Sequence, residues 1–151
     1  MSMTHLHIMI NHLPLFGSAI AVVLLGWAVM ARSRDLTRAG FVLVLVCGFG
    51  AYASHWTGDG AEHQVEDLPW AQRELIHEHE EAADWALWIL GAAAVVSAAG
   101  LYRMRKEGTA RQEATVVLVL VIFGFAATAK TALEGGKIRH EEVRPGFVFP
   151  Q

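Results

Sequence analysis

The sequence HIMINHLPLFGSAIAVVLLGWAVMA, residues 7–31, contains no Lys, Arg, Asp or Glu. A helix needs about 20 mostly apolar residues to cross the hydrocarbon core of a bilayer. Three further apolar segments follow at 39–56, 83–102 and 114–133. Four segments cannot close a β-barrel, and only a helix satisfies its own backbone hydrogen bonds in lipid. The sequence therefore predicts four transmembrane helices. No basic region precedes the first segment, so we expect it to be a retained helix rather than a signal peptide.

The composition excludes several classes of protein. The chain has 151 residues, of which 54% are hydrophobic and 18% charged, and its mean hydropathy is +0.35. A soluble domain has about 25% charged residues. The formal net charge of −3 provides no basic surface for nucleic acid. A single cysteine, Cys47, excludes a disulfide scaffold and covalent haem attachment through a CxxCH motif.

Charge is distributed unevenly between the predicted connections. The two short turns, 32–38 and 103–113, hold seven Lys and Arg against three Asp and Glu, a formal charge of +4. The remaining residues, including the segment 57–82 and the tail 135–151, hold five basic and twelve acidic groups, a charge of −7. Because Lys and Arg are enriched in cytoplasmic loops, we expect an all-α, four-helix up-down bundle, one domain over 1–151, with both termini extracytoplasmic.

Local signals place the helix ends at this outer side. Thr57-Gly58-Asp59-Gly60 is expected to end the second helix, because paired glycines disfavour a helix interior. Asp67 before Pro69 is typical of a helix start, so the third helix is predicted to begin near Trp70 and to enter the membrane around Trp85. Gly135-Gly136 is expected to end the fourth helix.

All eight histidines fall on the outer, acidic side. They belong to all four helices or their immediate extensions, so a bundle would gather them at one end: His5, His7, His12, His55, His63, His77, His79 and His140. His5 and His12 share a helix face, whereas His7 lies off it. His77 and His79 lie about 200° apart around a helix, so we expect only one of them to point inward. Imidazole with carboxylate is the ligand set of Zn, Fe and Cu sites.

Four short segments carry a resemblance to a family. They are His7-x-x-x-Asn11-His12-x-Pro14, then Thr57-Gly58 followed by Glu62 and Glu66, then His79-Glu80-Glu81-Ala82-Ala83, and Gly135-Gly136-x-Ile138-Arg139-His140-x-Glu142. With these motifs the chain resembles an uncharacterised family of four-span bacterial integral membrane proteins. The resemblance implies the same topology and a bacterial inner-membrane location, and it supplies no activity. It singles out His7, His12, His79 and His140, and it favours Glu62 or Glu66 over His55.

The first functional hypothesis is a transition-metal site of one or two ions (Fe, Cu or Zn) at the outer face. Its chemistry would be redox, hydrolytic or metal handling. The candidate ligands are the histidines and carboxylates His7, His12, Glu62, Glu66, His79, Glu80 and His140. Asn11, Arg139 and Glu142 are expected to orient those ligands or balance their charge.

Two other classes of function remain open on the sequence. A b-type haem electron-transfer subunit would use two histidines on facing helices as axial ligands, here His12 with His55 or His79. A non-catalytic small membrane subunit or assembly factor would use the acidic end to attract cations or a partner. The expected partners are the lipid bilayer, a membrane redox complex or a second copy of the chain.

Overall fold

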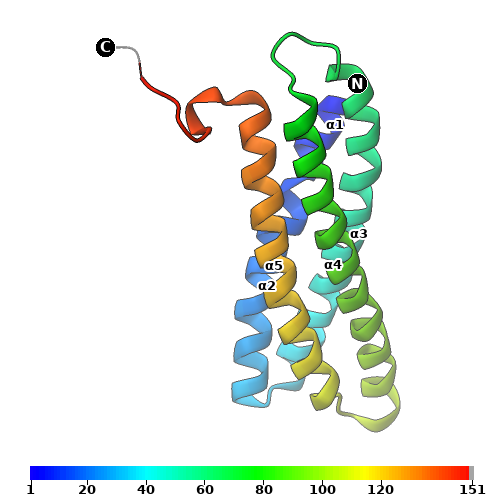
Figure 1. The fold of residues 1–151 in the computed structure, drawn as a ribbon. Coiled ribbons are helices and arrows are strands. Elements are labelled where there is room, and N and C mark those ends of the chain that lie inside the picture. The colour runs from blue at the N-terminus through cyan, green and yellow to red at the C-terminus, as the bar shows by residue number, and fades with distance from the viewer. Residues whose placement is uncertain (150–151) are drawn as a thin grey trace.

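The chain folds into long helices that lie side by side. The computed structural model describes residues 1–149 and contains no strand within them. The elements are α1 (Met3–Ile10), α2 (His12–Ala31), α3 (Arg34–Val65), α4 (Arg73–Glu107), α5 (Arg111–Arg139) and a short 3-10 turn, Glu141–Val143. Figure 1 shows α2 to α5 as four parallel rods, with both chain ends at the same end of the molecule. The predicted all-helical class is confirmed, as are four helical units apolar enough to cross a membrane: α1 with α2, then α3, α4 and α5.

A short break separates α1 from α2. Asn11 ends α1, and its N–H donates to the carbonyl of His7 at 2.9 Å. Pro14 follows three residues later and has no N–H to donate to the carbonyl of Ile10. The break therefore lies where the backbone hydrogen-bond ladder is already incomplete.

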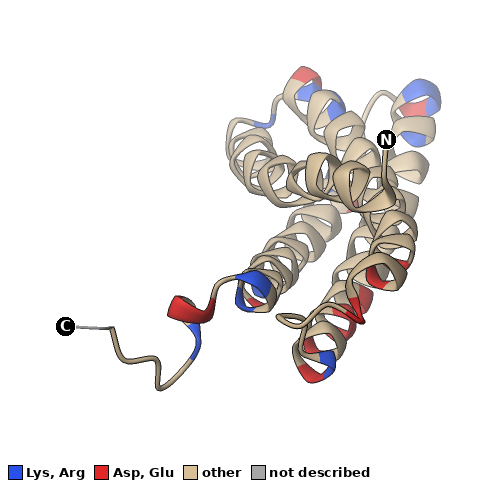
Figure 2. Ribbon diagram, turned by 90° about the horizontal axis from the view of Figure 1, so that it is seen from above, with Lys and Arg blue, Asp and Glu red and all other residues tan. Residues whose placement is uncertain are grey.

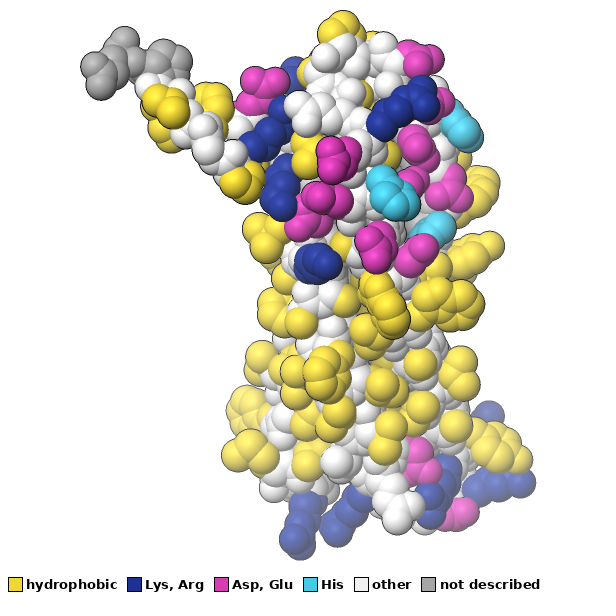
Figure 3. Space-filling model, viewed as in Figure 1, with side chains coloured by type: hydrophobic (Ala, Val, Ile, Leu, Met, Phe, Trp, Pro, Cys, Tyr) yellow, Lys and Arg dark blue, Asp and Glu magenta, His cyan; other side chains and the backbone are white. Residues whose placement is uncertain are grey.

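The long helices exceed the thickness of a membrane. At about 1.5 Å per residue, the 35 residues of α4 span roughly 52 Å, against about 30 Å of hydrocarbon. Figure 3 shows an apolar band around the middle, with charged side chains at both ends. Large apolar side chains in the band are exposed, such as Trp27 at 66% and Phe49 at 74%. Such exposure is costly in water and favourable in lipid.

The two ends differ in charge and are named accordingly. The basic end comprises 32–38 and 103–113, and the acidic end comprises α1, the α3–α4 connection and the last turns of α5. Figure 2 looks down on the acidic end, where acidic segments gather at the end of α3 and the start of α4. Residues 73–82 of α4 belong to this end and precede the apolar segment 83–102.

The helices pack through a narrow core of apolar side chains. Leu25, Phe41, Val44, Leu90 and Val121 are fully buried and come from all four helical units. Each such side chain, fully buried, contributes about 1.5–3 kcal/mol relative to exposure to water. In lipid this driving force is weaker, so close packing between small residues carries more of the association.

The predicted helix ends at the acidic side are wrong. α3 continues through Gly58 and Gly60 to Val65, and α5 continues through Gly135 to Arg139. α4 begins at Arg73, later than the predicted start near Trp70. A glycine inside a helix costs about 1 kcal/mol relative to alanine. Side chains of neighbouring helices occupy the space beside Gly58, Gly60 and Gly135, so these glycines allow close packing within the continued helices.

Candidate metal centre

Two histidine side chains meet at the acidic end of the bundle. His7 comes from α1 and His79 from α4, and their ring centroids lie 6.2 Å apart with the ring planes at 89°. Both side chains are half-buried. The backbones of α1 and α4 have no pair of Cα atoms within 8 Å among the described residues. The two imidazole side chains therefore bring α1 and α4 together where their backbones are not in contact.

Each ring is fixed by a backbone carbonyl on a neighbouring helix. His7 Nδ1 lies 3.0 Å from the carbonyl oxygen of Ser54 in α3, and His79 Nδ1 lies 2.9 Å from that of Thr131 in α5. A carbonyl oxygen only accepts, so Nδ1 of each ring donates. In a neutral imidazole the other nitrogen, Nε2, then has a free lone pair. Both rings are thus held in the tautomer in which Nε2 binds a metal.

Two glycines make room for the two rings. A Cβ atom at Gly58 would lie 3.3 Å from His7 Cε1, and one at Gly135 would lie 2.9 Å from His79 Cε1. Each glycine lies four residues after the residue whose carbonyl holds the ring, at Ser54 and Thr131. The same arrangement, a carbonyl that holds the ring and a glycine four residues later, therefore occurs on α3 for His7 and on α5 for His79.

The environment favours the neutral form of His79. Burial lowers the pKa of the His79 imidazole, and this effect outweighs the opposing hydrogen bond to the Thr131 carbonyl. His79 lies in the part of α4 that precedes the apolar segment 83–102. The neutral ring is the form that binds metal ions.

A pair of carboxyl groups lies on the same end of the bundle. Burial, together with the neighbouring carboxyl group of Glu62 in α3, raises the pKa of Glu80 in α4 to about 7. Two neighbouring carboxyl groups are costly to ionise together.

Two buried polar atoms beside His7 have no hydrogen-bond partner in residues 1–149. They are Asn11 Oδ1 and Ser54 Oγ. Asn11 lies one helical turn after His7, and Ser54 supplies the carbonyl that holds the His7 ring. Buried polar atoms without partners are uncommon and mark places where water, an ion or a ligand is accommodated.

The other candidate ligands lie apart from this pair. The His12 side chain is exposed, with Nδ1 3.1 Å from the carbonyl of Ile8, and its ring stacks on Phe16 at 6.1 Å. His140 is exposed and pairs with Glu142 at 3.0 Å. Neither of these histidines faces the other two rings.

The remaining predicted site residues have partners of their own. His55 Nε2 lies 2.7 Å from Asp84 and its Nδ1 lies 3.5 Å from Asp59, so carboxylates face both ring nitrogens. Glu66 lies near His63 and Arg73, and the Arg139 guanidinium lies over the Trp70 ring at 5.0 Å. Within residues 1–149, no three side chains of His, Cys, Asp or Glu are grouped to hold one ion.

The choice left open between His77 and His79 is resolved. His79 is half-buried and faces His7, whereas His77 is exposed. The alanines on the His79 face, Ala82 and Ala86, are 2% and 5% exposed. The carbonyl contributions of Ser54 and Thr131 were not predicted, because every residue has a carbonyl. The spacing Ser54-x-x-x-Gly58 and Thr131-x-x-x-Gly135 is the sequence signal that accompanies them.

Comparison with family models, with curated proteins and with solved structures finds no match to this chain.

Proposed function

We propose that the protein is a membrane protein that binds a transition-metal ion between His7 and His79 and hands it on at the acidic end of the bundle. The observation that carries the proposal is the paired geometry of the two rings, 6.2 Å apart and each fixed through Nδ1. A metal bonds imidazole nitrogen at about 2.0 Å, so the centroids of two rings on one ion lie from about 5 Å apart at a tetrahedral angle to about 6.5 Å apart at a linear one. The separation of 6.2 Å lies within this range, toward the linear arrangement.

The ligand set favours a single iron or copper ion over zinc. Structural zinc sites have four protein ligands and catalytic ones three, whereas only two imidazoles converge here. Imidazole suits copper and iron as well as zinc. A centre with two protein ligands keeps open positions, and open positions allow an ion to be received from one partner and released to another.

The charge of the acidic end supports metal handling. The residues outside the two basic turns have a formal charge of −7, and a surface of one sign raises the local concentration of ions of opposite sign. Glu62 and Glu80 form the carboxyl pair on this end. They are suited to attract a cation before the imidazoles bind it.

A metal inventory of the purified protein tests this proposal. The full chain in detergent is loaded with Cu, Fe or Zn, passed over a desalting column and analysed for bound metal. We expect close to one equivalent of copper or iron per chain. Less than about a tenth of an equivalent of every metal, after loading under both oxidising and reducing conditions, contradicts the proposal.

A b-type haem is the second candidate function. Bis-histidine haem ligation also uses two imidazoles from separate helices, and the pairing of His7 with His79 without a third ligand favours it over a multi-ligand ion site. The carboxyl groups on this end favour a free ion instead. An absorption spectrum of protein produced with haem supply separates the two, since only haem gives a Soret band.

We also infer an up-down topology in the inner membrane of a bacterium, with both termini and the acidic end outside. The charges of +4 and −7 at the two ends and the positive-inside tendency support this orientation. The prediction can be checked with two exposed glutamines, Gln72 at the acidic end and Gln112 at the basic end.

Gln72→Cys is expected to react with a membrane-impermeant maleimide in intact cells, and Gln112→Cys only after the cells are permeabilised. The native Cys47 is buried, so the wild type serves as the unlabelled control. If Gln112→Cys is labelled in intact cells and Gln72→Cys is not, the basic end faces outward and the inferred orientation is wrong.

A further inference from the structure

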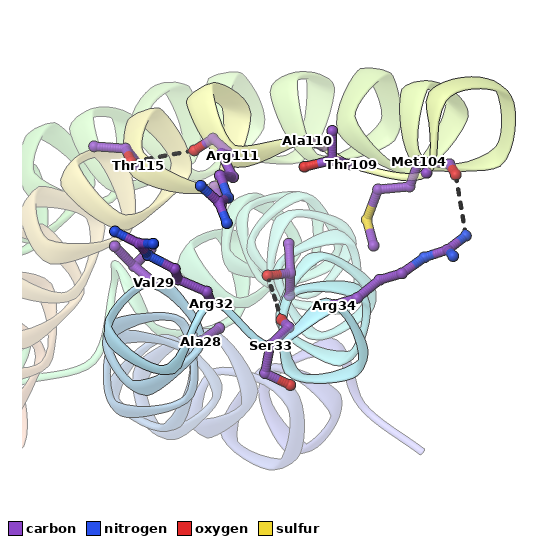
Figure 4. Close-up of a pocket in the computed structure, with 13 residues that line it drawn as sticks. Ala28, Val29, Arg32, Ser33, Arg34, Met104, Thr109, Ala110, Arg111 and Thr115 are labelled. Atoms are coloured by element: carbon purple, nitrogen blue, oxygen red, sulfur yellow. Dashed lines mark hydrogen bonds between the residues drawn. The ribbon is translucent and has the colours of Figure 1, made fainter.

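A second feature lies at the opposite, basic end of the bundle. A cavity of about 260 Å³ opens between the α2–α3 turn and the α4–α5 turn. Its wall includes Arg32, Arg34 and Arg111, together with the hydroxyl-bearing residues Ser33 and Thr109. No residue of the proposed metal centre belongs to it. Figure 4 shows the side chains that line it.

Two arginines point into the same space without an acidic partner. In Figure 4 the guanidinium groups of Arg32 and Arg111 approach each other from α2 and α5. Across the part of the chain that the structure describes, no carboxylate lies within 4.0 Å of either group. The nearby carboxylates Glu107 and Glu113 both pair with Arg103 instead. Both side chains are exposed, and two like charges gathered in this way favour a bound anion between them.

Arg32 is held in a backbone conformation that disfavours it. Its φ of 53° and ψ of 33° put it in the left-handed region at the end of α2. In residues 1–149 it is the one non-glycine residue with positive φ. Glycine occupies this position most readily, so the arginine costs stability there. The guanidinium that Arg32 directs to the cavity gives a functional reason for an arginine at this position despite the loss of stability.

Two helices also begin at the cavity wall. α3 begins at Arg34 and α5 at Arg111, and residues from both starts line the cavity. α5 has Ala110 at its N-cap and no side-chain cap, so its first N–H groups have no partner from the N-cap side chain. Helix starts carry a partial positive charge and bind anions. They add to the two guanidinium groups.

The cavity lies at the border of the apolar band. Figure 3 shows the basic side chains of this end directly below the exposed apolar side chains. Lipid phosphate groups lie at this depth in a bilayer. Basic pockets between transmembrane helices at this level bind anionic lipid headgroups, and arginine binds phosphate oxygens in a fork geometry that lysine lacks.

We propose that this cavity binds a phosphate group, supplied by the headgroup of an anionic membrane lipid. Arg32 and Arg111 hold the phosphate oxygens from two sides, and the start of α5 donates backbone N–H groups. The bound lipid joins the α2–α3 turn to the α4–α5 turn. This site is independent of the proposed metal centre.

Native mass spectrometry of the full chain tests the lipid site. The protein is mixed in detergent with equal amounts of phosphatidylglycerol and phosphatidylcholine, and the bound fraction of each is measured. Each basic residue near an anionic lipid surface contributes to binding, so Arg32→Gln/Arg111→Gln is expected to lower the bound phosphatidylglycerol by roughly tenfold or more. The control Arg38→Gln/Arg105→Gln removes the same charge from the same end outside the cavity, and should stay within about twofold of wild type.

A second variant separates binding from folding. Arg32→Gly removes the guanidinium and relieves the left-handed backbone, so it should bind less phosphatidylglycerol while its thermal midpoint in lipid-free detergent rises. If millimolar inorganic phosphate displaces the lipid and protects the wild type by itself, the phosphate site stands and its source is free phosphate. Equal losses in the cavity and control double variants, or no loss in either, would overturn the proposal.

Discussion

Replacing His79 by alanine is expected to lower bound metal more than tenfold. The variant loses one of the two imidazoles that converge at the acidic end, and removing even groups that only orient ligands costs about 10–100-fold in metal affinity. The measurement is metal per chain after loading and desalting of the purified protein. If the centre is haem, the corresponding result is loss of the Soret band or a change from six to five ligands at the iron.

His77→Ala is the matched control for this experiment. It removes the same side chain from the same helix two residues earlier, but His77 is exposed and does not meet His7. We expect wild-type metal content in His77→Ala and also in His12→Ala, because His12 faces its own helix and Phe16. Equal metal content in His77→Ala and His79→Ala would contradict the assignment of the ligand pair.

Gly135→Ala is expected to destabilise the protein and reduce metal binding together. The added Cβ would lie 2.9 Å from His79 Cε1, closer than van der Waals contact, so the ring must leave its position beside Thr131. Forcing an extra carbon into a packed site costs about 1–3 kcal/mol. The measurements are the thermal midpoint in detergent and bound metal per chain.

The adjacent glycine gives the opposite expectation. A Cβ at Gly136 meets nothing within 4 Å, and alanine stabilises a helix interior by about 0.8–1.0 kcal/mol relative to glycine. Gly136→Ala should therefore raise the thermal midpoint and leave bound metal unchanged. If both variants are stabilised and both bind metal normally, His79 is not held in the way the structure describes.

The apolar segments of the fold were predictable because their signal is local. Residues 7–31, 39–56 and 114–133 are apolar almost throughout, and each lies within a helical unit of the structure. The helix ends were not predictable in the same way. Gly58 and Gly135 favour a helix stop by their intrinsic properties, and the imidazoles packed beside them in the structure are contacts between helices that a local signal does not reveal.

The histidine pair was predictable only in part. His7 and His79 were both among the expected ligands, and one of His77 and His79 was expected to point inward, without a choice between them. His12 was among the expected ligands because the family resemblance singled it out, although it lies on a different helix face from His7. In the structure His7 faces His79, whereas His12 is exposed and stacks on Phe16.

The two carbonyl tethers have a mechanical consequence. His7 fastens α1 to α3 through Ser54, and His79 fastens α4 to α5 through Thr131, while the α1 and α4 backbones do not touch. An ion bound by both rings would therefore link all four of these helices. Because a ligand stabilises the state that binds it, metal binding would stabilise the acidic end against local unfolding, and metal release would destabilise it. Amide hydrogen exchange in α1 would then report occupancy directly, without any spectroscopic signal from the metal.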